Sequence, residues 1–305
     1  MRIITYDELE KKDELTSVLS LSFGAWSSPR QMDEIRRLNT RTRNSPGGFC
    51  ALENNHIIGF VGVMEIPTRA LNGDTEPVGG IYGVATHPRK ARQGVSTELM
   101  KRAHEYFASK GYRFSFLTTR KTYIAYAFYR HLSYEDALCF PSAFKFLTKK
   151  RKSIENGSAR IPWKAVMDIY EEFTASKTGF VVRDVDFFKA LPRIASLDQG
   201  RPERILVGEK GYVFYSTMDG PLTIDELVST DQDEMKNLIT TIESKAREVV
   251  SDRCVLNPCL LEVYRSRGYL TQVESHGLLM VKALTEATFN EVYGRRFYQT
   301  TLDLF

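Results

Sequence analysis

The amino-acid sequence predicts an α/β (α+β) fold with two similar lobes, each a mixed central sheet flanked by helices. Apolar residues recur at strand or helical spacing through the first 119 residues, in the order strand, two helices, three strands, helix, strand. A polar segment then interrupts the pattern, and a fainter copy of it follows. With 305 residues, of which 42% are hydrophobic, the chain is long enough for one large domain or two ordinary ones.

The elements of the first half are separated by residues that favour turns and helix ends. Asp7 is placed to cap the first helix, and Asn54-Asn55-His56 is a good hairpin turn between two strands. Gly111 is expected to end the helix that follows the central strand. The predicted elements are strand 1–5, helices 9–23 and 29–39, strands 49–53, 57–64 and 81–86, helix 96–110, strand 112–119 and a short helix at 123–131.

A linker is expected between the two halves of the chain. Residues 148–161 are polar and charged and contain glycine and serine, which is typical of a linker. We therefore predict a first lobe over 1–147 and a second lobe over 162–305. The basic run 149–152 could also be a nucleic-acid or targeting patch, although a solvated linker is the favoured interpretation.

The second half repeats the first faintly. Tyr264-Arg265 followed by Gly268-Tyr269 aligns with Tyr129-Arg130 followed by Ser133-Tyr134. The aromatic and apolar residues of 297–305 predict a docked C-terminal tail. The other elements expected in this half are helices at 163–173, 184–191, 231–249 and 260–269, strands at 205–207, 212–216 and 222–228, and a helix near 286–293.

The stretch 79–97 predicts an anion-binding turn. The strand ends at His87-Pro88, because proline cannot donate to a sheet and restricts the residue before it. A basic loop and Gly94 then lead into a helix, whose first N–H groups lack internal partners and attract negative charge. Gly94 lets a ligand approach the backbone, and Arg89 and Arg92 add full charges. A pyrophosphate suits this site, although the glycine spacing matches neither a P-loop nor a dinucleotide fingerprint.

This turn resembles motif A of the GCN5-related N-acetyltransferases (GNAT). The strand end Val84-Ala85-Thr86, Pro88 and Gly94 match the motif, whereas Ala91 and Ser96 depart from it. The resemblance implies a GNAT fold in each lobe and acetyl-CoA as cofactor. The alternative is an ordinary strand-turn-helix with a solvated basic loop. The residues expected to bind the cofactor are Val84, Ala85, Thr86, Arg89, Arg92, Gln93, Gly94, Val95, Ser96 and Thr97.

The same resemblance supplies candidates for catalysis. Phe128-Tyr129 occupies the place of an aromatic-tyrosine pair in the next motif, which makes Tyr129 the candidate general acid, or else a packed core tyrosine. For the base, Glu65 is the nearest acidic residue on a core strand. The alternative, implied by the resemblance, is a terminal carboxylate at Phe305. We assign Trp26 and Tyr82 to the substrate pocket.

The second lobe is expected to keep the fold without binding the cofactor. Its helix at 231 begins with Asp231, Asp233 and Glu234, and an acidic helix start repels a pyrophosphate. This pairing of one active and one degenerate lobe resembles the enhanced-intracellular-survival type of acetyltransferases. Those proteins carry a further sterol-carrier-like domain, for which this chain is too short.

Composition limits the remaining function classes. A net charge of +4 argues against a dedicated nucleic-acid binder, and the spacing of the four cysteines is not that of a zinc site. With no signal peptide or membrane span visible, a cytoplasmic location is expected. We predict transfer of acetyl from acetyl-CoA to a small-molecule or peptide amine, without nucleic-acid or membrane partners. Homo-oligomer formation stays open, and the alternative is a non-catalytic acetyl-CoA-binding or regulatory module.

Overall fold

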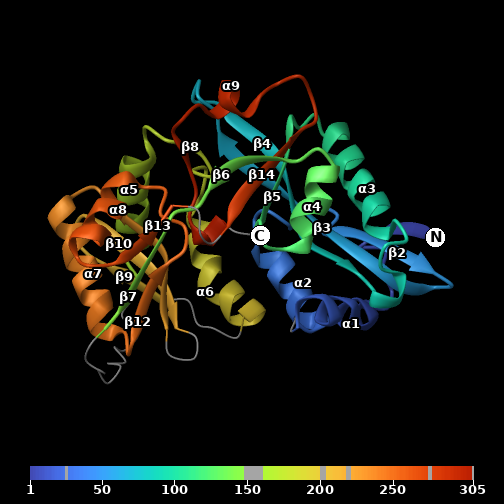
Figure 1. The fold of residues 1–305 in the computed structure, drawn as a ribbon, viewed down its shortest axis with the longest axis horizontal. Helices are drawn as coiled ribbons and strands as arrows, with labels where there is room; N and C mark the ends of the chain where they lie inside the picture. The colour runs from blue at the N-terminus through green and yellow to red at the C-terminus, as the bar shows by residue number, and fades with distance from the viewer. Residues whose placement is uncertain (25–26, 148–160, 200–203, 218–220, 274–276, 304–305) are drawn as a thin grey trace.

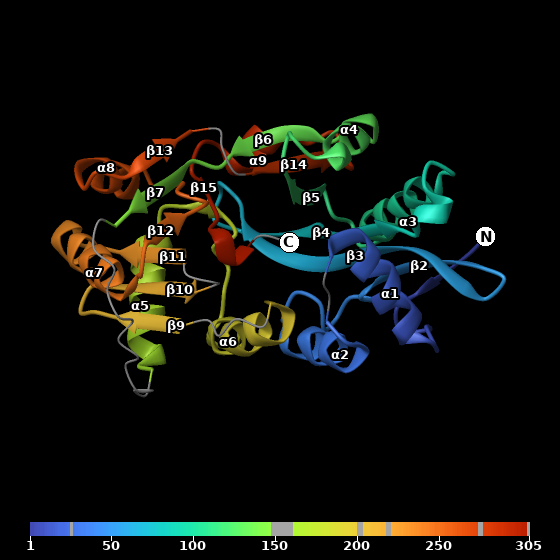
Figure 2. The ribbon, with the colours of Figure 1, turned by 60° about the horizontal axis from the view of Figure 1, so that its bottom comes forward.

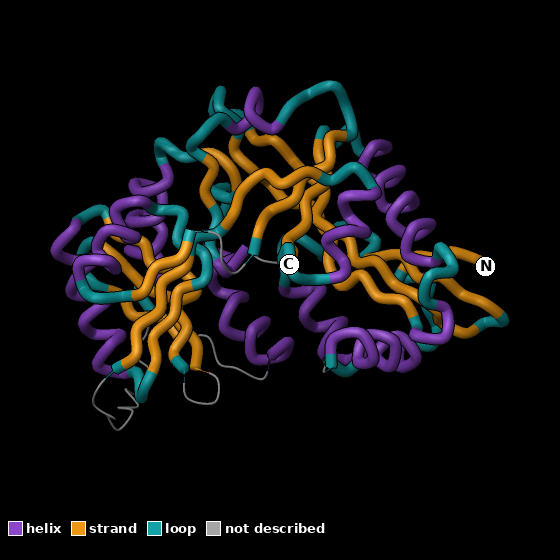
Figure 3. The backbone as a smooth tube through the Cα atoms, in the orientation of Figure 1, coloured by secondary structure: helices purple, strands orange, loops and turns teal. Residues whose placement is uncertain are grey.

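The computed structural model describes residues 1–24, 27–147, 161–199, 204–217, 221–273 and 277–303. Two sheets form two halves that lie beside each other, and helices flank each sheet (Figures 1 and 3). The strand order of the first sheet is β1-β2-β3-β4-β5-β14-β6, with β8 and β15 off this path, and that of the second is β13-β7-β12-β11-β10-β9. No helix within the described residues is long and apolar enough to cross a membrane.

The first half follows the predicted order of elements. The Asn54-Asn55 turn is confirmed, since both residues take the left-handed backbone conformation of a tight hairpin, with φ of 50° and 65°. The elements are β1 (Arg2–Thr5), α1 (Lys12–Phe23), α2 (Pro29–Leu38), β2 (Gly48–Glu53), β3 (His56–Arg69), β4 (Thr75–Thr86), α3 (Val95–Ser109), β5 (Phe114–Thr119), α4 (Ile124–His131), β6 (Glu135–Cys139) and β7 (Ser142–Phe146).

The second half of the chain also alternates helices with strands, most of which belong to the second sheet. Its segments are α5 (Trp163–Thr174), β8 (Thr178–Gly179), α6 (Val185–Gln199), β9 (Arg204–Val207), β10 (Gly211–Thr217), β11 (Leu222–Ser229), α7 (Gln232–Lys245), β12 (Val249–Asp252), α8 (Pro258–Ser266), β13 (Leu270–Gln272), β14 (Leu278–Ala283), α9 (Phe289–Tyr293) and β15 (Phe297–Tyr298). Of the predicted linker, residues 148–160, including the basic run, lie outside the described part of the chain.

Each half of the chain contributes at least one strand to the sheet of the other. β14, from the second half of the chain, lies between β5 and β6 in the first sheet and runs antiparallel to both. β7, from the first half, lies between β12 and β13 in the second sheet. Pairing therefore crosses the predicted boundaries at 147 and 162, and each half needs the other to complete its sheet (Figure 2).

Helices cover both faces of each sheet. In the first half, Leu99 and Phe107 of α3 pack against Val63 of β3, and α4 joins the same cluster. Leu15 and Leu19 of α1 pack on the opposite face. In the second half, α7 and α8 cover one face, and α5 and α6 cover the other.

The internal repeat is visible in the backbone. Tyr134 N donates to the Tyr129 carbonyl at 3.1 Å, and Tyr269 N donates to the Tyr264 carbonyl at 3.0 Å. Gly268 has a φ of 78° in this turn, and Ser133 takes the matching conformation with a φ of 65°. Ser133 thus adopts a left-handed conformation that a glycine adopts more easily.

Three expected element boundaries were wrong. The helix expected at 231–249 ends at Lys245, because 249–252 form β12 and pair with β11 and β7. Asp7 does not cap α1, which begins at Lys12, and its carboxylate instead binds Arg36. The helix expected at 184–191 continues to Gln199, although Pro192 lies within it.

Candidate active site

β4 and β5 separate at the centre of the first sheet. These parallel strands pair only at Gly79 with Ser115 and at Gly80 with Phe116. β4 nevertheless continues to Thr86, and its register with β3 shifts between Phe60 and Gly62. Gly83 lies in this irregular stretch with a φ of 59°, which only glycine adopts without strain. The β5-facing edge of 81–86 therefore has no strand partner among the described residues, and we call it the open edge of β4.

The turn after β4 leads this open edge to the start of α3. Gly94 is left-handed with a φ of 80°, and no heavy atom lies within 4 Å of where a side chain would begin. Its carbonyl accepts the first helical hydrogen bond, from Glu98 N at 3.1 Å. Because α3 begins at Val95, the N–H groups of Val95, Ser96 and Thr97 have no partner within the helix. A left-handed glycine and a helix N-terminus therefore follow the basic loop, while anion binding by this turn stays a prediction.

The two residues that depart from the motif, Ala91 and Ser96, differ in their contacts. Ser96 and Thr86 hydrogen-bond through their hydroxyls and so join the strand end to the first turn of α3. Ala91 is exposed. Arg89 and Arg92 are also exposed, and neither has an ion-pair partner among the described residues. Two guanidinium groups are therefore free to meet an anion beside the helix N-terminus.

The hydroxyl of Tyr129 differs in its surroundings from that of the neighbouring Tyr134. Tyr129 is buried in α4, and no described residue hydrogen-bonds its hydroxyl. Burial raises the pKa of Tyr129 to about 12, so the group keeps its proton at neutral pH. Its neighbour Tyr134 is satisfied by contrast, since its hydroxyl bonds Ser115 at 2.6 Å and His104 at 2.9 Å.

The model of the acetyltransferase (GNAT) domain family matches residues 5–137. These residues belong to that family. The GNAT domain thus contains the open edge of β4, the turn into α3 and Tyr129. Its family is one of acyltransferases, which sets the class of reaction that this half supports.

Solved structures extend the likeness to both halves. A GCN5-related N-acetyltransferase from Kribbella flavida aligns with a TM-score of 0.65 at 20% identity over 93% of this chain and 72% of that one. Eis1 from Mycobacterium abscessus aligns with a TM-score of 0.59 at 16% identity over 93% and 74%. A tandem GNAT protein from the clavulanic acid biosynthesis pathway aligns at 0.55 and 10% identity over 94% and 99%. No curated protein matches the chain. At these identities the likeness shows the fold alone, and it confirms the predicted fold class.

Glu65 lies near the C-terminal end of α3, whereas the Gly94 turn lies at the N-terminal end of this helix. It pairs with Gly79, whereas Ala85 pairs with Phe60, so Glu65 is about 17 Å along β3 from the strand end. Its carboxylate accepts a hydrogen bond from the Tyr106 hydroxyl at 2.5 Å and lies 3.5 Å from Lys110 Nζ. The structure does not bring Glu65 to the Gly94 turn.

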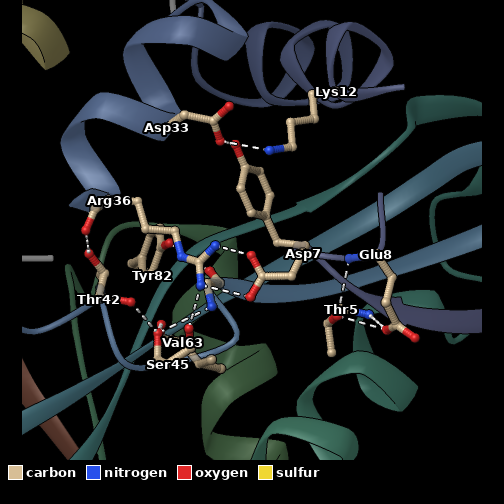
Figure 4. A network of polar contacts seen from close by, with 12 residues as sticks. Thr5, Asp7, Glu8, Lys12, Asp33, Arg36, Thr42, Ser45, Val63 and Tyr82 are labelled. Atoms are coloured by element: carbon tan, nitrogen blue, oxygen red, sulfur yellow. Dashed lines mark hydrogen bonds and ion pairs between the residues drawn. The ribbon is translucent and has the colours of Figure 1, made fainter. Parts of the chain in front are cut away.

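Tyr82 lies on the face of the GNAT domain opposite α3. Its hydroxyl donates to the Gly47 carbonyl at 2.7 Å, and its ring packs on Phe60 at 6.2 Å between centroids. Figure 4 shows it beside Arg36, which binds Asp7 and the Ser45 carbonyl. Burial raises the pKa of Tyr82. Trp26, predicted for the substrate pocket, and Phe305, predicted as a candidate catalytic carboxylate, lie outside the described residues.

The second half lacks an equivalent anion site at the start of α7. Asp231 caps this helix, and its carboxylate accepts hydrogen bonds from Asp233 N at 3.0 Å and Glu234 N at 2.9 Å. The N–H groups that would bind an anion are thus already occupied by a carboxylate.

Gly83 and the Arg41–Asp303 ion pair are features of the structure that the sequence did not predict. The glycine within a predicted strand could have indicated the irregular stretch of β4.

Proposed function

We propose that the protein transfers an acetyl group from acetyl-CoA to a primary amine by direct transfer, with the cofactor held by the GNAT domain. The observation that carries this proposal is the open edge of β4 at 81–86, which leads directly to the left-handed Gly94 and the start of α3. When bound, acetyl-CoA would supply an acetyl group activated as a thioester.

The residues present fit this cofactor. The backbone of Val84, Ala85 and Thr86 offers hydrogen-bonding groups along an extended ligand. The N–H groups of Val95 to Thr97 suit a pyrophosphate, and the open space at Gly94 lets it approach the backbone. Arg89 and Arg92 supply charge, whereas the Gln93 side chain donates to the Arg89 carbonyl at 3.1 Å. Gln93 therefore helps to shape the loop that carries the charges.

Tyr129 is proposed as the general acid. Burial raises its pKa, so the hydroxyl stays protonated at neutral pH and can donate a hydrogen bond to the negative charge that forms on a departing thiolate next to it. Two groups are candidates for the base that removes a proton from the amine. One is Glu65, which Tyr106 and Lys110 engage, and the other is a terminal carboxylate at Phe305.

Calorimetry with acetyl-CoA, followed by turnover assays, tests the proposal. Polyamines, aminoglycosides and peptides are the amine panel, and a thiol-detecting reagent reports release of coenzyme A. The proposal predicts one acetyl-CoA bound per chain and turnover with at least one amine. No binding would contradict it, and binding without turnover on any amine would favour the non-catalytic module instead.

A further inference from the structure

The second half has a slot that corresponds to the open edge of β4. β11 pairs with β12 only from Leu222 to Ile224, although β11 continues to Ser229. Its register with β10 shifts at Phe214, much as that of β4 with β3 shifts at Phe60. A small cavity lies at this place. Its lining includes Asp225, Glu226 and Asp252 of the sheet together with Tyr298 and Thr300 from the end of the chain.

Segment 297–303 therefore lies at the place in the second half that corresponds to the open edge of β4 in the GNAT domain. A buried charge network holds it there. Arg183 forms ion pairs with both Glu226 and Asp303, and the Thr300 hydroxyl donates to Glu226 at 2.9 Å. Thr300 N also donates to Asp303 Oδ2 at 3.0 Å. The side chains of Thr300 and Asp303 thus attach the segment to the second half, and the Thr300 N–H bond orders the segment internally.

The same network reaches the first half. Arg41 Nη2 donates to Asp303 Oδ1 at 2.7 Å, and the Arg41 carbonyl accepts from Glu65 N of β3 at 2.8 Å. Two arginines thus meet two carboxylates, and Arg41, Arg183, Glu226 and Asp303 are each at most 8% exposed. A charge network of this kind seldom adds more stability than apolar packing would, but it fixes the orientation of the groups it joins.

The segment also touches the first sheet beside the point where β4 and β5 separate. The Phe297 ring lies 6.2 Å from that of Phe116, the last β5 residue paired with β4. The Arg41 guanidinium lies 5.7 Å from the Phe180 ring, which packs on Phe116 at 5.8 Å. α3 and α4 cover one face of the sheet, and α1 packs on part of the other. We infer that an amine acceptor approaches from this second face, which the segment borders through Phe297.

We propose that the slot of the second half is a seat for segment 297–303, and that Asp303 is a positioning residue that locks this segment, through Arg41, against the acceptor face of the GNAT domain. The proposal rests on the acetyl-transfer function above. It assigns the second half the role of holding part of the first half's site in place.

Neutralising Asp303 in the full chain tests this role against a matched control. Asp303→Asn removes a carboxylate held by two cations, and Glu243→Gln does the same in the second half, where Glu243 binds Lys145 and Arg267. Asp303→Asn leaves the buried network with an excess positive charge. The double variant Arg41→Gln with Asp303→Asn restores neutrality and guards against a simple loss of folding.

The measurements separate positioning from folding and from cofactor binding. We expect both Asp303 variants to lower kcat/KM for the amine at least tenfold, with acetyl-CoA affinity within twofold of the wild type and no effect of Glu243→Gln. We also expect faster amide hydrogen exchange in segment 297–303. Unchanged exchange and turnover in the folded double variant would overturn the proposal, as would an equal effect of Glu243→Gln. A wild type that binds no acetyl-CoA would overturn the proposed function, while the exchange measurement still decides whether Asp303 holds the segment.

Discussion

Tyr129 and Tyr264 occupy the same place in the two copies of the repeat but have different partners. The Tyr264 hydroxyl donates to the Asp252 carboxylate at 3.0 Å, whereas no described residue hydrogen-bonds the Tyr129 hydroxyl. A hydroxyl engaged by a buried carboxylate has a structural role, while an unengaged one can meet a reacting group. Comparing the two tyrosines therefore allows a packing role to be distinguished from the catalytic role proposed for Tyr129.

We predict that Tyr129→Phe keeps acetyl-CoA affinity but lowers turnover by roughly 10²–10⁴-fold, the usual cost of a lost general acid. Tyr264→Phe is the control, because it removes the equivalent hydroxyl from the half without the anion-binding turn. Steady-state kinetics and calorimetry on both variants measure the effects. Unaffected turnover in Tyr129→Phe would show that this tyrosine is merely packed.

The buried carboxyl of Asp252 is expected to make the free energy of unfolding depend on pH. Burial raises its pKa to about 7, and the charge of Asp225 adds to this, while hydrogen bonds from Cys254 N and Tyr264 lower it. An unfolded carboxyl titrates near pH 4, so between about pH 4 and 7 the folded protein holds a proton that the unfolded chain has lost. The contribution of Asp252 is therefore largest at low pH and falls as pH rises to about 7.

We expect the free energy of unfolding to lose up to about 1.4 kcal/mol per pH unit from this group over that interval. Asp252→Asn should lack this loss. Urea unfolding at pH 5, 6, 7 and 8 measures the difference between variant and wild type. Parallel pH profiles for the two proteins would contradict the assignment.

At the scale of elements, the strand exchange ties the two sheets together. β14 completes the first sheet and β7 the second, so unfolding either half removes an inner strand from the other. We therefore expect one cooperative unfolding transition in urea. Far-UV circular dichroism and tryptophan fluorescence should give coincident curves. Two separated transitions would mean that the halves are stable independently.

The sequence predicted those elements whose conformation depends on neighbouring residues, and it missed those that depend on residues distant in the chain. The Asn54-Asn55 hairpin and the Gly94 turn follow from neighbouring residues, so spacing was enough to find them. The end of α7 was missed because Val249 and Val250 pair with strands that are distant in sequence. The spacing of apolar residues indicates whether a segment is a helix or a strand, but not which strand it pairs with. It therefore could not predict the strand exchange. Nor could it predict the Arg41–Asp303 pair, whose members are 262 positions apart.

At the scale of the molecule, the two halves have similar folds but differ at the open strand edge and at the start of the helix that follows it. The first half leaves the edge of β4 open beside a basic turn with a free helix N-terminus. In the second half, Tyr298 and Thr300 line the slot, and Asp231 caps the corresponding helix. We therefore predict a single cofactor site in the chain, located in the GNAT domain.

Acetyl-CoA binding by two glycine variants at opposite ends of α3 tests this claim most directly. Gly94 and Gly111 are both left-handed, and neither has a heavy atom within 4 Å of where a side chain would begin. Replacing either by leucine thus imposes similar backbone strain, but only Gly94 lies at the proposed site. Calorimetry should show one acetyl-CoA per chain for the wild type and for Gly111→Leu, and no measurable binding for folded Gly94→Leu. Wild-type affinity in Gly94→Leu, or two sites per chain, would contradict the account.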